Sequence, residues 1–172
     1  MDKQDIRSIL KTALSLFLIC AVAAGILAIV NSVTAPMIQK NNEKNADEAR
    51  LLVLSSADSF EKSEKNGYTY YIGLTENGPV GYIFTTTASG YGGAIEVMTG
   101  IDTEGKITGI SILNINETPG LGMNAKKSSF LSQFADNTGK FTVIKNAVPG
   151  ENEILAITSA TITTTAVTNA VN

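Results

Sequence analysis

The sequence of 172 residues predicts an α+β fold, in which a single N-terminal membrane helix precedes a domain of antiparallel hairpins flanked by short helices. Residues 12–30 are apolar and uncharged, and residues 68–113 contain alternating stretches typical of half-buried strands. Strands followed by short helices indicate an α+β domain. A terminal helix is predicted within residues 158–172, where apolar side chains recur at helical spacing, notably Ile162, Ala166 and Ala170.

Charge and composition exclude several functions. The net charge is −3 and Lys126–Lys127 is the only basic cluster, so nucleic acid is not expected as a partner. Histidine is absent, and the single cysteine, Cys20, lies in the apolar run, which excludes disulfides, thiol redox pairs and thiolate metal sites. We therefore predict no catalytic side chain and no metal ligand, and any redox chemistry must come from a bound group.

The uncharged run from Thr12 to Val30 contains nineteen residues. A helix of this length, at about 1.5 Å per residue, just spans a hydrocarbon core roughly 30 Å thick. We therefore expect a transmembrane helix over residues 12–30, behind a tail of residues 1–11. Small residues at 32–35 leave a cleaved signal peptide as the alternative. The run exceeds the about 7–15 apolar residues of a signal peptide, which favours a retained anchor.

Flanking charges predict the orientation of the anchor. Lys3, Arg7 and Lys11 precede the run, whereas Lys40 and Lys44 follow it. Because positive charge tends to stay on the cytoplasmic side, we expect a single-pass protein of the cell membrane. Its N-terminus would be cytoplasmic and its main domain extracytoplasmic.

Residues 31–66 are expected to connect the anchor to a domain of residues 67–172. Pro36 suits the first turn of a new helix, and the stretch from Met37 to Leu54 is charged first and apolar at its end. This predicts a second helix that docks on the domain. The polar stretch from 55 to 66 is typical of a loop.

Two hairpins are predicted in the first half of the domain, with turns at Asn77-Gly78-Pro79 and at Asp102–Gly105. Beyond them, the pattern indicates a short helix over residues 125–134 and a strand over residues 141–144. The segments expected to pair in the hairpins are residues 68–74 with 80–84 and residues 94–101 with 106–113.

Two loops rich in glycine follow these predicted strands. Gly90, Gly92 and Gly93 surround Tyr91, so the backbone can approach a flat group closely and the ring offers a stacking surface. The alternative is a flexible connection with a half-buried aromatic ring. The second loop, Gly120–Ala125, formally matches G-x-G-x-x-A. We exclude a Rossmann domain because the preceding strand belongs to an antiparallel hairpin and no second parallel strand ends in an acidic residue.

The hydroxyl-rich segment at the start of the terminal helix predicts an anion site. Unpaired N–H groups and the helix dipole favour an anion such as phosphate at this position. Thr158 and Ser159 are suitable N-cap residues. The alternative is a capped helix that only closes the domain. Further hydroxyl donors come from three residues of the helix: Thr161, Thr163 and Thr164.

The segment Ile157–Thr163 resembles the flavinylation motif of the RnfG/NqrC family, Asp-x-x-Ser/Thr-Gly-Ala-Thr. In that family the last threonine carries FMN through a phosphoester bond made by a separate flavin transferase. The resemblance assigns this role to Thr161 and the preceding alanine to Ala160. Ser159 replaces the common glycine and keeps the position small, whereas Leu155 replaces the aspartate.

Two other segments resemble the same family in the same order along the chain. Residues 90–95 with 100–102 resemble its glycine loop and first hairpin strand, and residues 117–122 resemble its Glu-Thr-Pro-Gly-Leu-Gly loop, which lies beside the flavin. The FMN-binding residues are therefore expected to be Thr161 as the covalent site, with Thr158, Ser159, Ala160, Thr163, Thr164, Glu117, Thr118, Gly120, Leu121, Gly122 and Tyr91.

The resemblance implies an electron-transfer subunit with covalently bound FMN in a membrane ion-translocating ferredoxin:NAD oxidoreductase, the Rnf complex. Its partners would be other membrane subunits, especially a second flavinylated one, and the transferase that matures it. Such a subunit is a redox carrier and not a complete enzyme. The alternatives are the NqrC-like subunit of a sodium-translocating NADH:quinone reductase and a membrane-anchored binding or scaffold module without a cofactor.

Overall fold

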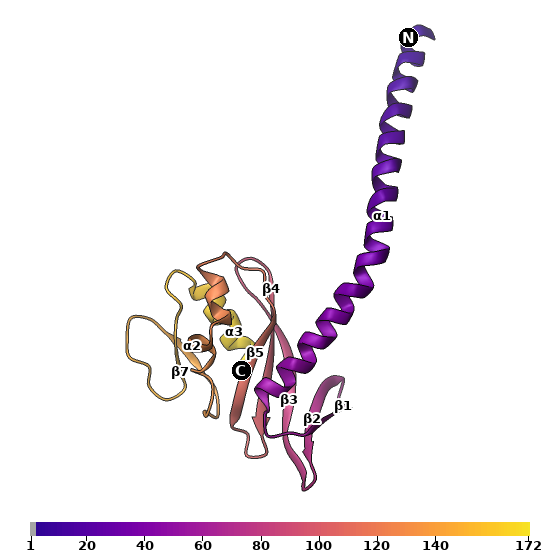
Figure 1. Cartoon of the computed structure of the whole chain (residues 1–172). Helices are drawn as coiled ribbons and strands as arrows, with labels where there is room; N and C mark the ends of the chain where they lie inside the picture. The colour runs from indigo at the N-terminus through magenta and orange to yellow at the C-terminus, as the bar shows by residue number, and fades with distance from the viewer. Residues whose placement is uncertain (1–2) are drawn as a thin grey trace. The chain divides into compact units, whose positions relative to one another are not determined.

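The computed structural model describes residues 3–172, which divide into two units between Glu43 and Lys44. Helix α1 (Lys3–Val53) contributes to both units (Figure 1). In the first unit its large apolar side chains are exposed, from Ile9 to Ile38. By length and composition, the helix is a candidate membrane span.

Helix α1 continues through Pro36, so the prediction of a second helix starting there is wrong. A proline inside a helix removes one backbone hydrogen bond and costs about 3 kcal/mol. Proline therefore interrupts the hydrogen-bond ladder here without ending the helix.

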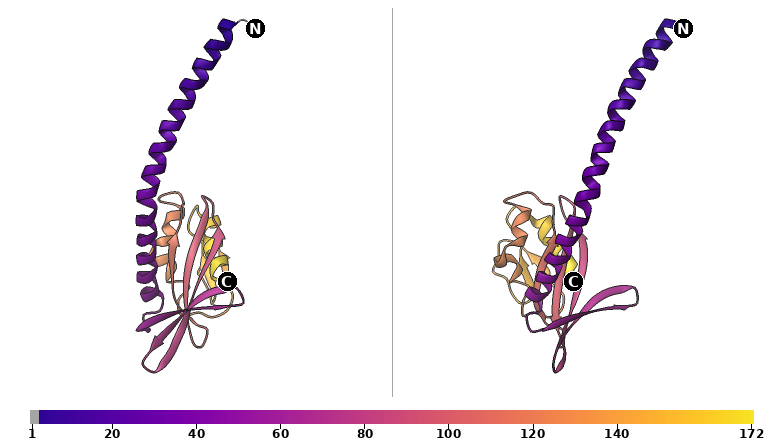
Figure 2. Two further views of the ribbon diagram at one scale, coloured as in Figure 1. Left: turned by 90° about the vertical axis from the view of Figure 1, so that its right-hand side faces the viewer. Right: turned by 45° about the vertical axis from the view of Figure 1, so that its right-hand side comes forward.

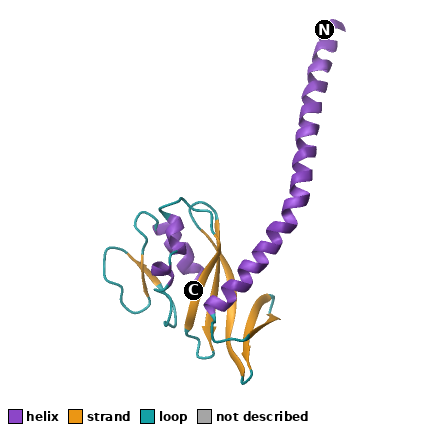
Figure 3. Ribbon diagram, in the orientation of Figure 1, coloured by secondary structure: helices purple, strands orange, loops and turns teal. Residues whose placement is uncertain are grey.

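The second unit is built on a five-stranded antiparallel sheet in the order β1-β2-β3-β4-β5 (Figure 3). Both predicted hairpins are confirmed: β2 pairs with β3, and β4 pairs with β5. The strands are β1 (Ser59–Lys65), β2 (Tyr68–Thr75), β3 (Gly78–Ser89), β4 (Ala94–Asp102) and β5 (Ile107–Asn114).

Strand β1 lies where the sequence favoured a loop. Its sequence, Ser-Phe-Glu-Lys-Ser-Glu-Lys, is charged on both faces because it forms an edge of the sheet and buries little. Charged side chains on an edge strand also discourage pairing with other chains. An edge strand of this kind lacks the apolar alternation by which strands are recognised.

Short elements follow the sheet. The predicted helix over residues 125–134 is instead a 3-10 helix, η1 (Gly122–Lys126), followed by a single turn, α2 (Ser128–Leu131). Strand β6 (Thr142–Ile144) was predicted, whereas its parallel partner β7 (Glu153–Leu155) was not. The chain then enters helix α3 (Thr161–Val171).

The sheet separates two apolar cores. Helix α3 covers one face, and the last turns of α1, from residue 44 onward, cover the other (Figure 2). The α3 core contains Ile95, Val97, Phe134 and Val167, among others. The α1 core contains Ala49, Val53, Leu54, Ala57, Ile83 and Met98. Because both faces of the sheet are covered, the site lies in the loops that follow the strands and at the start of α3.

Candidate functional site

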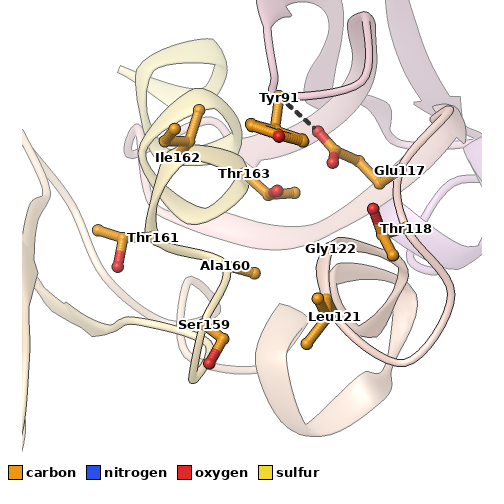
Figure 4. Close-up of a pocket in the computed structure, with 10 residues that line it drawn as sticks. All are labelled: Tyr91, Glu117, Thr118, Leu121, Gly122, Ser159, Ala160, Thr161, Ile162 and Thr163. Atoms are coloured by element: carbon orange, nitrogen blue, oxygen red, sulfur yellow. Dashed lines mark hydrogen bonds between the residues drawn. The ribbon is translucent and has the colours of Figure 1, made fainter.

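One pocket gathers most of the predicted site residues (Figure 4). Three segments that are distant in sequence form it: the loop after β3, the loop after β5 and the start of α3. Its volume of about 510 Å³ lies in the range of small-molecule sites. The residues that line it are Tyr91, Glu117, Thr118, Leu121, Gly122, Ser159, Ala160, Thr161, Ile162 and Thr163.

Glu117 joins two of these segments. Its side chain is only 8% exposed, and Oε1 accepts hydrogen bonds from the backbone N–H groups of Tyr91 at 2.7 Å and Gly92 at 3.3 Å. The first of these bonds is drawn in Figure 4. Bonds from backbone donors to a carboxylate are strong. Glu117 therefore fixes the loop that carries Tyr91, a role that the sequence resemblance did not supply.

Glycines allow the close approach of these loops. A Cβ atom on Gly92 would collide with the carbonyl oxygen of Asn116. On Gly122 it would lie 2.7 Å from Oε2 of Glu117 and 2.8 Å from Oγ1 of Thr163. Gly120 has a φ of 77°, which glycine adopts at little cost, and it shapes the turn outside the pocket.

Helix α3 starts at Thr161 without a side-chain cap. The N-cap residue is Ala160, which makes no side-chain hydrogen bond, so the expectation that Thr158 or Ser159 caps the helix is wrong. The first intrahelical bond runs from the N–H of Thr164 to the carbonyl of Ala160. An uncapped helix start presents N–H groups and a positive partial charge to the pocket.

Ser159 adopts a left-handed backbone conformation, with φ of 62°. This is the position at which the motif of the RnfG/NqrC family carries glycine. Glycine adopts positive φ values freely, whereas other L-residues are strained there. The backbone conformation thus gives a physical reason for the glycine in that motif.

Two predicted threonines lie outside this pocket. Thr158 lines neighbouring surface depressions together with Leu155. Thr164 is fully buried, and its hydroxyl is bonded to the backbone of Ile157 and Ala160. Contrary to expectation, the Thr164 hydroxyl is therefore not among the donors that reach an anion in the pocket.

Ile162 is a pocket residue that the sequence pattern placed on the core-facing stripe of α3. Its side chain is 56% exposed and lines the pocket, whereas Ala166 and Ala170 are buried as expected. In the first turn of α3 the buried side chains are Thr163 and Thr164, so the helical spacing of apolar residues misplaced Ile162. Direct adjacency to Thr161 was the one sequence signal that pointed to the site.

Thr161 lies at the rim of the pocket, half-buried. Figure 4 shows its side chain on the other side of the loop from Glu117 and Leu121. Thr161 also borders two neighbouring depressions, one lined by Ser89 and Asn169 and one lined by Lys145. Thr161 thus lies at the point where several concave surfaces meet.

Comparison with known proteins assigns the chain to a family. Residues 90–172 match the FMN-binding domain, and residues 1–52 match the RnfG N-terminal region. The G subunit of the Na⁺-translocating ferredoxin:NAD⁺ oxidoreductase complex of Acetobacterium woodii is 39% identical over 188 residues, covering 98% of this chain and 90% of that protein. The chain belongs to the RnfG family.

Other members of the RnfG family are similar along nearly the same length. The G subunit of the proton-translocating ferredoxin:NAD⁺ oxidoreductase complex of Clostridium ljungdahlii is 39% identical, covering 98% of this chain and 90% of that protein. The G subunit of an ion-translocating oxidoreductase complex from Methanosarcina acetivorans is 30% identical, covering 98% of this chain and 93% of that protein.

Solved structures share the fold of this RnfG family member. The C subunit of the Na⁺-translocating NADH-quinone reductase of Parabacteroides distasonis has a TM-score of 0.60 and 20% identity, covering 77% of this chain and 89% of that one. NqrC of Shewanella oneidensis has a TM-score of 0.56 and 17% identity, covering 66% of this chain and 61% of that one. These likenesses confirm the predicted α+β class.

The residues of the pocket fit FMN. Three apolar side chains, Tyr91, Leu121 and Ile162, are 74%, 41% and 56% exposed and can contact a flat ring system. The hydroxyl groups of Ser159 and Thr161 and the uncapped start of α3 suit a phosphate. The pocket therefore offers an apolar part and an anion-binding part, as a flavin nucleotide requires.

Proposed function

We propose that this chain is the FMN-carrying electron-transfer subunit of a membrane ion-translocating ferredoxin:NAD⁺ oxidoreductase complex. The observation that carries the proposal is the 39% identity to the G subunits of two such complexes over 98% of the chain. Convergence of the three resembling segments on one pocket supports it independently. Other subunits of the complex, including a second flavinylated membrane subunit, would be its partners.

The FMN is attached covalently through a phosphoester to Thr161 in this proposal. Thr161 is the first residue of α3 and has a half-exposed side chain. Because the N-cap side chain of Ala160 makes no hydrogen bond, the first N–H groups of the helix can interact with the phosphate. A covalent bond also prevents loss of the cofactor by dilution outside the cytoplasm.

The chain's own residues bind and orient the cofactor. FMN supplies redox chemistry that accepts electrons in pairs and passes them on singly. Tyr91, Leu121 and Ile162 flank the ring system, while Glu117 keeps the Tyr91 loop in place. With no histidine and no dinucleotide fingerprint, the chain acts as a carrier between redox partners and not as a complete oxidoreductase.

The membrane arrangement proposed for the chain has residues 12–30 crossing the bilayer, residues 1–11 in the cytoplasm and the FMN-binding domain of residues 67–172 outside. The exposed apolar surface of α1 from Ile9 to Ile38 supports a span. The excess of Lys and Arg before residue 12 supports this orientation. A flavin transferase acting on the same side as the domain would complete maturation.

The proposal is tested by intact mass and in-gel flavin fluorescence after denaturation, in a host that contains the transferase. We expect a fluorescent wild-type band with the added mass of FMN minus water. Thr161→Ala should lack both signals, while Thr161→Ser retains a hydroxyl and should recover them at least in part. A fluorescent Thr161→Ala band would move the attachment site to another residue.

The alternatives predict different results. A cofactor-free scaffold would be colourless even when produced with an active transferase, so absorbance in the flavin bands separates it from a flavoprotein. The NqrC-like alternative shares the fold at 17–20% identity, whereas the G subunits of ion-translocating oxidoreductases reach 39%. Co-purification of ferredoxin:NAD⁺ oxidoreductase activity with the chain supports the Rnf assignment.

A further inference from the structure

The hydroxyl of Thr164 connects helix α3 to the loop that precedes Thr161. Oγ1 accepts a hydrogen bond from the N–H of Ile157 at 3.0 Å and donates one to the carbonyl of Ala160 at 3.0 Å. The N–H of Ala160 in turn donates to the carbonyl of Ile157 at 2.9 Å. These three bonds close the loop from Ile157 to Ala160 against the first turn of α3, and the side chain of Thr164 is fully buried.

The two residues before this loop, Leu155 and Ala156, are also held by hydrogen bonds to two other segments of the chain. The side-chain amide of Gln133 accepts from the N–H of Leu155 at 2.7 Å, and its Nε2 donates to the carbonyl of Leu155 at 3.5 Å. The N–H of Ala156 donates to the carbonyl of Ile144 at 2.9 Å. Ser159, with its left-handed backbone, lies inside the enclosed loop. A strained residue is retained only where the surrounding bonds hold it in place.

We propose that Thr164 is a positioning residue for flavin transfer onto Thr161. The inference rests on the proposed function, in which the hydroxyl of Thr161 is the acceptor. The hydroxyl of Thr164 bonds to the backbone of Ile157 and of Ala160. It therefore holds Ala160, the residue directly before the acceptor Thr161, in one conformation. Positioning a nucleophile before reaction lowers the entropic part of the barrier. Thr164 contributes without contacting the flavin, since it lies outside the pocket.

The transfer step has a definite balance. The oxygen Oγ1 of Thr161 attacks the FMN phosphorus of a flavin dinucleotide held by the transferase. A P–O bond to Thr161 forms, the pyrophosphate P–O bond breaks, and the nucleoside monophosphate leaves. The hydroxyl proton of Thr161 passes to a base on the transferase, and no oxidation or reduction occurs. What this chain must contribute to the transfer is therefore the correct position of Oγ1 of Thr161.

Thr168 provides a matched control on the same helix. It is buried like Thr164, with 2% exposure, and its hydroxyl donates to the carbonyl of Thr164 at 2.9 Å, also four residues back. That bond stays within α3 and does not reach the loop before Thr161. Replacement of either threonine by valine removes a buried hydroxyl from the same helix and keeps the side-chain shape.

The experiment measures the rate of flavin transfer to the full-length chain in detergent, with purified transferase and a flavin dinucleotide. Wild type, Thr161→Ala, Thr164→Val, Thr164→Ser and Thr168→Val are compared by in-gel fluorescence and intact mass. We expect Thr164→Val to lower kcat for transfer on the order of tenfold to a hundredfold, with KM for the chain little changed. Thr164→Ser, which retains both hydrogen bonds, and Thr168→Val should remain close to wild type.

Amide hydrogen exchange of the peptide containing Ile157 adds a second readout. It should speed up in Thr164→Val and stay unchanged in Thr168→Val. Equal transfer rates in the two valine variants, or a Thr164→Ser variant as slow as Thr164→Val, would overturn the proposal. If Thr164→Val does not fold, Thr164→Cys and Thr168→Cys make the same comparison, because a thiol is small and hydrogen-bonds only weakly. Failure of the proposed function is recognised separately, because wild type would then gain no flavin or Thr161→Ala would gain it.

Discussion

At the scale of single residues, Ser159 carries the clearest backbone strain in the site. Its φ of 62° costs a non-glycine residue about 1–3 kcal/mol. We expect Ser159→Gly to raise the free energy of unfolding by roughly 0.5–1 kcal/mol, because relief of strain exceeds the added entropy of the unfolded chain. Chemical denaturation followed by circular dichroism measures the change.

A matched control for Ser159→Gly is Ser129→Gly in α2. Ser129 is exposed and helical, so glycine there should lower stability by up to about 1 kcal/mol. If both substitutions changed stability in the same direction, the strain assigned to Ser159 would be wrong.

Gly122 is the residue on which the width of the pocket depends. In Gly122→Ala the new methyl group would press on Glu117 and Thr163, so we expect a loss of about 1–3 kcal/mol in stability and reduced FMN incorporation. Fluorescence per mole of protein measures incorporation. Gly150→Ala serves as the control, because its Cβ would meet only the flexible carboxylate of Glu153, at 3.3 Å. Wild-type FMN incorporation in Gly122→Ala would contradict the role assigned to the close packing of Gly122 against Glu117 and Thr163.

At the scale of elements, the last turn of α1 is held on the sheet by polar as well as apolar contacts. The guanidinium of Arg50 lies 3.9 Å from the ring centroid of Tyr71, and its side chain is only 14% exposed. The hydroxyl of Thr108 on β5 donates to the carbonyl of Val53. A Cβ on Gly100 would collide with that same carbonyl, so the helix end fits the sheet closely.

The contact between Arg50 and Tyr71 is predicted to stabilise the second unit. A double-mutant cycle with Arg50→Met and Tyr71→Leu should give a coupling energy of about 0.5–2 kcal/mol. Lys44→Met, at an exposed position of the same helix, should show no coupling to Tyr71→Leu. A coupling energy near zero for Arg50 would show that apolar packing alone fixes the helix end.

At the scale of the whole molecule, the division at residue 43 predicts where the chain can be cut. A fragment of residues 44–172 keeps Ala49, Val53 and Leu54 in the core beneath the sheet, so we expect it to unfold cooperatively and to accept flavin. A fragment of residues 55–172 loses these side chains and exposes Ile83 and Met98. Loss of one large buried apolar side chain costs about 1.5–3 kcal/mol. This is a large share of the free energy of unfolding of a domain, which is typically about 5–15 kcal/mol.

Thermal unfolding and dye binding to exposed apolar surface compare the two fragments. We expect a sharp transition and low dye binding for residues 44–172, and a broad transition with strong dye binding for residues 55–172. Equal stability of the fragments would mean that the end of α1 is dispensable to the fold.

Sequence alone determined the parts that depend on local pattern or on a continuous motif. The apolar run of α1, both hairpins and the terminal helix follow from periodicity and turn residues, which act over a few neighbours. The motif around Thr161 and the loop around Glu117 predicted two walls of one pocket. These signals lie in consecutive residues and require no knowledge of how distant segments pack.

Only the tertiary structure decided the features that depend on packing between distant segments. Strand β1 and helix η1 bury too little to leave a periodic signal, and β7 is too short to show one. The exposure of Ile162 and the burial of Thr164 depend on where α3 meets the sheet. The bond from Tyr91 to Glu117 depends on how the loops after β3 and β5 approach each other. The same threonine composition can bind an anion or fix a loop, and burial selects between these roles because a hydroxyl removed from water must take the partners that packing provides.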